Sequence, residues 1–473
     1  MKLCGWFCRA RTTASIAAGL ALLLCAVATQ ADDRPNIVYI LADDLGWKDL
    51  GFRGGNIRTP NLDRLAAGGA VLNAFYAQPF STQTRAALMT GRYPMRYGLQ
   101  TGSILPATRY GLPEEERTLG QALKEAGYRT AFIGKWQLGH VRPELWPTRR
   151  GFDYFYGTLS GQVGFALKKT DKADWRRNEQ ALKEEGYVTA LLAKDAARLI
   201  ERQEASHPLL LVLSFTAPGT SYGAPREIVE QVRDVADPAQ RSYAAAVTVL
   251  DQAVGEVLAA LERRGMLDNT LVVFHSDNGG AVPTKYPTGD GDVQDFAADN
   301  GVFRDGKGSL YEGGVRVTAL ASWRGRIKPK TTVTDVVHVT DMYATILHLA
   351  GASLEQPKKL DGLDLWPVLA DAQRSPRKEV LIDVEDFRGA LRVGEWKLVV
   401  YAALPSRVEL FDVSNDPEEA DNVAATYPDR VKDMMTKLTS YAYDMMPSKY
   451  LEELSAAEGG RLQSLWRYNP VRR

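Results

Sequence analysis

The sequence predicts an α/β fold: a doubly wound, mostly parallel central sheet with helices on both faces, plus a smaller C-terminal antiparallel-sheet subdomain. Continuous apolar runs at residues 36–41, 209–215 and 270–276 suit strands that are buried on both faces. Amphipathic helical patterns lie between these runs, which is typical of a doubly wound domain. After residue 375 the pattern changes to short strands of alternating polarity.

Start and stop signals delimit the helices between these strands. Thr59 is placed as an N-cap, Pro60 lies in the first turn, and Gly68 follows as a stop. A second helix precedes Gly127 and leads into a strand that ends near Gly134. Helices and strands therefore alternate through the first part of the chain.

Two domains follow from this pattern. Residues 32–375 form the predicted main domain, and residues 376–473 form an α+β subdomain with the strands "EVLIDV", "GALRVGEWKLVVYA" and "RVELFDV" and a helix near 427–441. Segments 157–174 and 279–306 have irregular composition, and we expect them to line a site and select its ligand.

The N-terminus has the pattern of a secretory signal peptide. Basic Lys2, Arg9 and Arg11 precede an apolar stretch at 14–28 and small residues up to residue 31. We therefore predict a signal peptide at 1–31 and a secreted or periplasmic protein. The apolar stretch is short for a bilayer, and we expect no second window that could span one.

Composition narrows the function classes. The chain of 473 residues is 45% hydrophobic and 25% charged, as in soluble globular proteins. Its three cysteines, Cys4, Cys8 and Cys25, all lie in the predicted leader, which excludes disulfides and thiolate chemistry from the mature protein. With three basic residues removed from 58, 55 remain against 58 acidic ones, and no basic patch indicates a nucleic-acid partner. The oligomeric state stays open.

Polar side chains follow three of the predicted strands. Asp43 and Asp44 come after the first, Asp277 and Asn278 after another, and Lys135 to Gln137 after a third. Ligands bind at the carboxyl ends of the strands of such sheets. An all-oxygen set suits Ca²⁺ and Mg²⁺ alike and predicts one divalent cation. Of the two ions we expect Ca²⁺, with Mg²⁺ as the alternative. The alternative is that Asp, Asn and Gly only form turns here.

Ser81 begins the helical stretch "STQTRAALMTG", in which Gly91 is placed as a C-terminal cap. Its hydroxyl either caps the helix or faces an anion held near the cation. Arg85, Lys135 and Lys307 are cations that a tetrahedral oxyanion would need, although a lone lysine is more often a solvated surface charge.

These motifs resemble the sulfatase family within the alkaline phosphatase superfamily, and the arylsulfatase B type in particular. The resemblance extends over nearly the whole mature chain, through "RPNIVYILADDLGWKDLGF", "TPNLDRLAAGG", "TRAALMTGRYPMRYGLQ", "LGQALKEAGYRTAFIGKWQLG", "DNGG", "GSLYEGGVR" and "GEWKLVVY". It implies metal-dependent hydrolysis of small sulfated esters, which include sulfated glycans.

The resemblance also assigns roles to residues. In the family the signature C-x-P-S-R, or its Ser-headed variant, is converted to formylglycine, whose hydrate attacks the ester; the matching residues here are Ser81 to Arg85. The implied catalytic residues are Ser81, Arg85 and Lys135, and the implied substrate-binding residues are Lys135, Gln137 and Lys307. The implied metal ligands are Asp43, Asp44, Ser81, Asp277 and Asn278.

The chain departs from the family pattern at three positions. Gln137 replaces the histidine of "GKWHLG", Gly219 replaces a histidine after "TAP", and Gln83 replaces the expected proline or alanine. Of the five histidines, only His140 and His275 lie near the predicted site in sequence, and both are also explained as core or loop residues.

Three functions therefore remain open. The first is a sulfatase with formylglycine at position 81. The second is a phosphoesterase or sulfoesterase of the same superfamily that uses unmodified Ser81 as nucleophile. The third is a non-catalytic relative that binds sulfated glycans.

Overall fold

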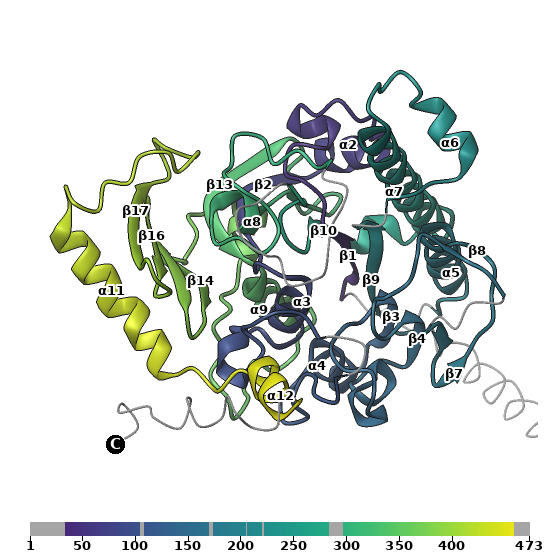
Figure 1. Cartoon of the computed structure of the whole chain (residues 1–473). Coiled ribbons are helices and arrows are strands. Elements are labelled where there is room, and N and C mark those ends of the chain that lie inside the picture. Colours follow the sequence, from purple (N-terminus) through teal and green to yellow (C-terminus); the bar gives the residue numbers. More distant parts are fainter. Residues whose placement is uncertain are drawn as a thin grey trace, which may run out of the picture.

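The computed structural model describes residues 34–104, 108–169, 174–204, 206–219, 222–282 and 297–457. The predicted signal peptide lies outside these residues. An 11-stranded sheet forms the centre of the molecule, in the order β11-β2-β12-β10-β1-β9-β3-β4-β6-β7 with β13 paired to β2 (Figure 1).

The middle of this sheet is parallel. Strands β10, β1, β9, β3 and β4 run in one direction, while β12, β11, β6 and β7 add antiparallel pairs towards the edges. The strands are β1 (Asn36–Asp43), β2 (Ala70–Tyr76), β3 (Arg129–Lys135), β4 (Tyr154–Thr158), β6 (Arg176–Arg177), β7 (Gln180–Ala181), β9 (Leu209–Pro218), β10 (Thr270–Ser276), β11 (Arg316–Val317), β12 (Ala319–Ser322) and β13 (Thr331–His338). A separate two-stranded sheet pairs β5 (Ala166–Leu167) with β8 (Gly186–Tyr187).

Helices cover both faces of the sheet. One face carries α3 (Ser81–Thr90), α4 (Leu119–Glu125), α9 (Val339–Leu349) and α10 (Trp366–Asp371); the other carries α2 (Pro60–Ala67), α5 (Val188–Glu201) and α7 (Pro238–Arg263). The remaining helices are α6 (Arg226–Gln231), α8 (Glu312–Val315), α11 (Pro428–Tyr443) and α12 (Lys449–Ala457), with 3-10 turns η1 (Gly51–Arg53), η2 (Pro94–Tyr97), η3 (Pro143–Leu145), η4 (Pro147–Arg149) and η5 (Leu267–Asn269).

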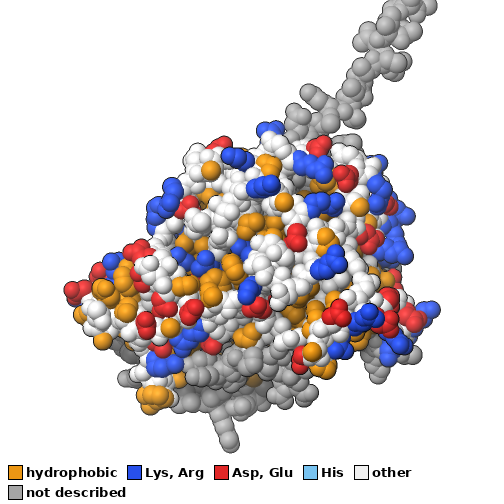
Figure 2. Space-filling model, turned by 90° about the horizontal axis from the view of Figure 1, so that it is seen from above, with side chains coloured by type: hydrophobic (Ala, Val, Ile, Leu, Met, Phe, Trp, Pro, Cys, Tyr) orange, Lys and Arg blue, Asp and Glu red, His pale blue; other side chains and the backbone are white. Residues whose placement is uncertain are grey.

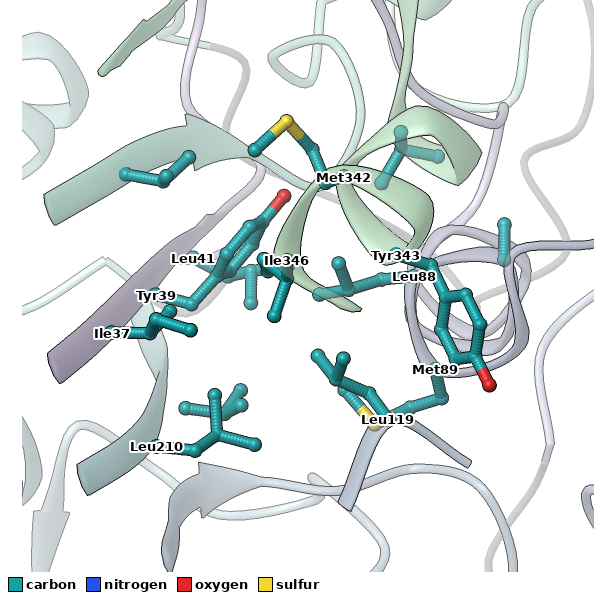
Figure 3. Packing of buried hydrophobic residues seen from close by; sticks show 14 of the residues in the cluster. Ile37, Tyr39, Leu41, Leu88, Met89, Leu119, Leu210, Met342, Tyr343 and Ile346 are labelled. Atoms are coloured by element: carbon teal, nitrogen blue, oxygen red, sulfur yellow. The ribbon is translucent and has the colours of Figure 1, made fainter. Parts of the chain in front are cut away.

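Strand β1 shows why its apolar run is continuous. Ile37, Tyr39 and Leu41 pack into the cluster under α3 and α9, whereas Val38 and Ile40 pack into the cluster under α5 and α7. Successive side chains of a strand point to opposite faces, so a strand covered on both sides is apolar at every position. Figure 3 shows the first of these clusters, with residues of β1, α3 and α9. The predicted α/β fold is confirmed.

Helix α7 is long and apolar enough by composition to cross a membrane, contrary to the expectation that no second such window occurs. In the folded protein 72% of that window is buried. This helix lies in the core, packed on α5 and β9.

The C-terminal part contains a four-stranded antiparallel sheet of β14 (Glu379–Val384), β15 (Arg388–Val393), β16 (Trp396–Tyr401) and β17 (Arg407–Asp412). Helix α11 packs across one face through Met434 and Leu438. The opposite face packs on Tyr76 and Tyr311 of the main part. Figure 1 shows this sheet and α11 at one side of the molecule.

Candidate active site

The ends of β1 and β10 bring four of the predicted residues together. These strands pair in parallel, with Ala42 opposite Ser276, so the residues that follow them meet. Carboxylate oxygens of Asp43, Asp44 and Asp277 all lie within 4.8 Å of one another. Asn278 donates from Nδ2 to Asp44 Oδ1 at 2.8 Å. The predicted oxygen cluster is therefore assembled, and it is almost completely buried.

Asp44 is held in an uncommon backbone conformation. Its φ of 61° lies in the left-handed region, where a non-glycine residue is strained. Its backbone N–H donates to Asp277 Oδ1 at 3.1 Å, which links the two ends of the cluster. Such strain is retained where surrounding contacts compensate for it, and it is frequent at functional sites.

Burial is the largest single influence on the pKa of each of the three carboxyl groups. It raises the pKa of Asp43 and that of Asp44, despite the lysines beside them. Burial also acts to raise the pKa of Asp277, but Arg85, Lys135 and a hydrogen bond with Asp43 together outweigh it, and the pKa is lowered. Carboxylates gathered out of water need cations, and a set of carboxylate and amide oxygens fits Ca²⁺ or Mg²⁺.

Ser81 is the first residue of α3, but it does not cap the helix. Its Oγ lies 3.2 Å from Asp43 Oδ1 and 3.2 Å from Asn278 Oδ1. Phe80 occupies the N-cap position, and its N–H donates to Gln83 Oε1 at 3.2 Å. The capping interpretation of Ser81 is therefore wrong, while Gln83 has a structural role at the start of the helix.

Each of the three carboxylates faces one of the predicted cations. Lys135 Nζ lies 2.9 Å from both oxygens of Asp43, and Lys307 Nζ lies 3.0 Å from Asp44 Oδ2. Arg85 donates to Asp277 and also lies 3.7 Å from Asp43. Its Nε donates to Ser214 Oγ at 3.2 Å, which fixes the guanidinium plane. All three cations are buried.

A cavity of about 450 Å³ opens over the cluster. Its inner wall includes Asp43, Asp44, Lys135, Gln137 and Lys307. A second group of lining residues was not predicted from the sequence; it comprises Ser103, Ile104, Tyr187, Thr189, Thr216, Ala217, Pro218 and Gly223. Residues 216–218 end β9, so their position at the carboxyl edge of the sheet was the one available signal. Residues 161–165 also line the cavity, within the segment expected to select the ligand.

The histidines do not line this cavity in the part of the chain that the structure describes. His275 lies in the core, where its Nε2 is 2.7 Å from the Tyr39 hydroxyl and burial lowers its pKa to about 4. His338 is buried beside Gln78, and His348 pairs with Asp364 at 2.7 Å. His140 follows the site in sequence but is not among the lining residues. Gln137, in contrast, is buried there with φ 52°, and its Oε1 has no hydrogen-bond partner among the described residues.

Comparison with known proteins places this geometry in a family. A family model described as Sulfatase matches residues 35–352, which include the whole acidic cluster. The chain belongs to the sulfatase family. It is therefore a sulfuric ester hydrolase by family, and the predicted resemblance is confirmed. A second model, described as N-sulphoglucosamine sulphohydrolase, C-terminal, matches residues 300–444 of this sulfatase and includes the four-stranded sheet.

Individual relatives agree with this assignment. Arylsulfatase J of Mus musculus is 31% identical, over 89% of this chain and 78% of that protein. N-acetylgalactosamine-6-sulfatase of Canis lupus familiaris is 34% identical, over 78% of this chain and 72% of that protein. The crystal structure of Ps i-CgsB in complex with k-i-k-neocarrahexaose superposes with a TM-score of 0.79 at 30% identity, covering 88% of this sulfatase and 94% of that chain.

Proposed function

We propose that this sulfatase hydrolyses the sulfate ester of a small sulfated carbohydrate or aryl compound, in a reaction that requires a divalent cation and takes place outside the cytoplasm. One observation carries the proposal. The Ser81 hydroxyl lies at hydrogen-bond distance from two members of a buried oxygen cluster, beside the cavity that contains Lys135 and Lys307.

The cluster is the expected cation site. Asp43, Asp44, Asp277 and Asn278 would hold the cation together with the oxygen of residue 81; we propose Ca²⁺, and the all-oxygen donor set also suits Mg²⁺. When bound, the cation supplies positive charge that stabilises the charge developing on the sulfate oxygens. It would also offset the repulsion among three buried carboxylates.

The protein's own residues account for binding and attack. Lys135 and Lys307 bind sulfate oxygens, and Arg85 holds the residues around position 81. The oxygen of residue 81 attacks sulfur, the bond between sulfur and the alcohol oxygen breaks, and the alcohol departs. If residue 81 is the formylglycine hydrate, its second hydroxyl expels sulfate by breaking the C–O bond, and water then rehydrates the aldehyde. If residue 81 is serine, water attacks sulfur and breaks the bond between sulfur and the serine oxygen. In both cases ester and water give alcohol and sulfate in total.

Carbohydrate is the substrate class that the relatives favour. One curated relative is named for N-acetylgalactosamine 6-sulfate, and one structural relative is complexed with a carrageenan oligosaccharide. Arylsulfatase J keeps an aryl ester in consideration. The polar inner wall of the cavity suits a sulfated sugar.

The absence of an imidazole from the described cavity wall has a kinetic consequence. A positioned general acid contributes about 10²–10⁴-fold to the rate, and here the departing alcohol does not receive a proton from histidine. We expect the rate with a series of aryl sulfates to rise steeply as the pKa of the leaving phenol falls. Measured kcat/KM values across that series test this, and a flat dependence would show that another acid protonates the leaving group.

Two measurements separate the candidate chemistries. A mass spectrum of the peptide containing residue 81, from protein made in its native host, distinguishes formylglycine, which lacks two hydrogens, from serine. Assays with aryl sulfate and aryl phosphate, with and without Ca²⁺ or Mg²⁺, distinguish a sulfatase from a Ser81-dependent phosphoesterase. Gln83 replaces the proline or alanine of the family signature that is converted to formylglycine, so an unmodified Ser81 stays among the alternatives. Binding of sulfated oligosaccharide without hydrolysis of either ester would support the non-catalytic alternative.

A further inference from the structure

An aromatic side chain stands exposed at the wall of the cavity. Phe165 is 48% exposed, although it lines the cavity together with Tyr187. The two rings lie 6.4 Å apart between centroids, with an angle of 44° between their planes. An exposed phenylalanine loses favourable hydrophobic burial unless a ligand covers it.

The position of this ring is fixed by its surroundings. The Val188 N–H donates to the Phe165 carbonyl at 2.9 Å, and the two-stranded sheet of β5 and β8 begins at the next residue. The ring lies directly on the backbone of Gly223, where an added Cβ would be 2.4 Å from Phe165 Cδ1. Tyr187 in turn donates from its hydroxyl to the Gly223 carbonyl at 2.7 Å. A rigid aromatic surface is therefore built into the wall.

A short segment connects this surface to the sulfate-binding lysine. Gly161 lies against the stem of Lys135, since an added Cβ would be 2.7 Å from Lys135 Cε. Phe165 follows four residues later, so its Cα lies within about 14 Å of that of Gly161. The wall between them adds Val163, and Ile104 also lines the cavity. A charged inner end and an apolar outer wall match a ligand with a sulfate group on a ring.

We infer that Phe165 is a specificity-determining residue that binds the flat apolar face of a ring in the sulfated substrate. The inference rests on the proposed function, because the sulfate is assigned to Lys135 and Lys307. The same chemistry is offered by an aromatic ring and by the C–H face of a pyranose. Acyclic sulfate esters lack such a face and gain nothing from Phe165.

Binding measured by calorimetry tests the inference without requiring turnover. The probes for the full chain with Ca²⁺ are inorganic sulfate, methyl sulfate, 4-nitrophenyl sulfate and glucose 6-sulfate. We expect Phe165→Ala to weaken binding of a ring sulfate roughly tenfold, as loss of an aromatic contact predicts, and to leave the two small probes unchanged. Loss with 4-nitrophenyl sulfate alone assigns an aromatic substrate, loss with glucose 6-sulfate alone assigns a pyranose, and loss with both supports the shared ring chemistry.

Two further variants sharpen the comparison. Gly223→Ala keeps the phenyl group but displaces it, and should weaken the same ring sulfates by a smaller factor. Tyr443→Ala removes an aromatic residue that is 67% exposed on α11, outside the cavity lining, and should change nothing. If Phe165→Ala weakens binding of methyl sulfate and of the ring sulfates equally, or weakens binding of neither ring sulfate, the inference about Phe165 is wrong. The proposed function is not affected by either result. Failure of the unaltered protein to bind sulfate would overturn the proposed function as well.

Discussion

Asp277 links the acidic cluster to the helix that carries Ser81. Its Oδ1 accepts the Asp44 backbone N–H at 3.1 Å, and its other oxygen accepts Arg85 from α3. The sequence predicted Asp277 from its position after a buried strand. Its partners could not be predicted, because they come from segments more than 190 residues away in the chain.

Replacing Asp277 should remove cation binding. Asp277→Ala deletes one of the three carboxylates in the proposed donor set, so we expect calorimetry to show no Ca²⁺ binding. The circular dichroism spectrum should remain that of the folded protein. Asp268→Ala is the matched control, since its side chain is 81% exposed on η5. Unchanged Ca²⁺ affinity in Asp277→Ala would contradict the proposed ligand set.

His275 makes stability dependent on pH. Burial lowers its pKa from 6.5 to about 4. The unfolded chain therefore takes up a proton below about pH 6.5 that the native protein takes up only near pH 4, and stability is lost as the pH falls through this window. In His275→Gln the loss of unfolding free energy between pH 7 and 4.5 should be smaller by about 2 kcal/mol. Urea titrations at several pH values measure the unfolding free energy of both proteins. If its dependence on pH is the same in His275→Gln as in the unaltered protein, a group other than His275 is responsible.

At the scale of elements, helix α3 holds residue 81 in place through contacts at both of its ends, the N-terminal end at residue 81 and the C-terminal end at Gly91. Gly91 ends the helix with φ 65°, and its N–H donates to the Ala87 carbonyl at 2.9 Å. This C-cap was predicted from the sequence. The close packing of Tyr343 from α9 against it was not, because no local pattern indicates which helix lies alongside.

Gly91→Ala should destabilise the protein through both strain and crowding. The left-handed backbone costs an alanine about 1 kcal/mol, and the added Cβ would lie 2.7 Å from Tyr343 Cδ1, which adds roughly 1–3 kcal/mol. Chemical denaturation measures the sum. Gly351→Ala is the control, because its φ is 64° but an added Cβ meets nothing within 4 Å. Equal losses in the two variants would show that Tyr343 moves aside without cost.

At the scale of the whole molecule, a buried ionic network joins the C-terminal sheet to the main part. Lys397 on β16 lies 3.0 Å from Glu312 on α8 and 2.8 Å from Glu419, and all three side chains are fully buried. Burial acts to raise the pKa of Glu312, but Lys397, Arg316 and Arg392 together outweigh it, and the pKa is lowered. Elsewhere charges of both signs are intermixed, as Figure 2 shows for one face.

Removing the Lys397 side chain should break this network and lower the free energy of unfolding. Lys397→Met removes the cation that Glu312 and Glu419 share while both carboxylates stay buried, and we expect a loss of about 3–5 kcal/mol in unfolding free energy. Lys437→Met breaks a pair of similar length, 2.8 Å from Glu379, but at the surface, and should cost less than about 1 kcal/mol. Denaturant titration of both variants makes the comparison. Similar small losses would mean that water reaches Glu312 and Glu419.

The sequence by itself determined the family, the buried strands β1, β3, β9 and β10, and the polar residues after β1, β3 and β10, because these depend on local patterns and on the rule that parallel strands end at one edge. Only the tertiary structure decided which neighbouring side chains share the site. His275 lies two residues from Asp277 yet packs in the core, and Ser81 turns to Asp43 and Asn278 instead of capping its helix. Side-chain direction depends on contacts between distant segments, and so does the exposure of Phe165.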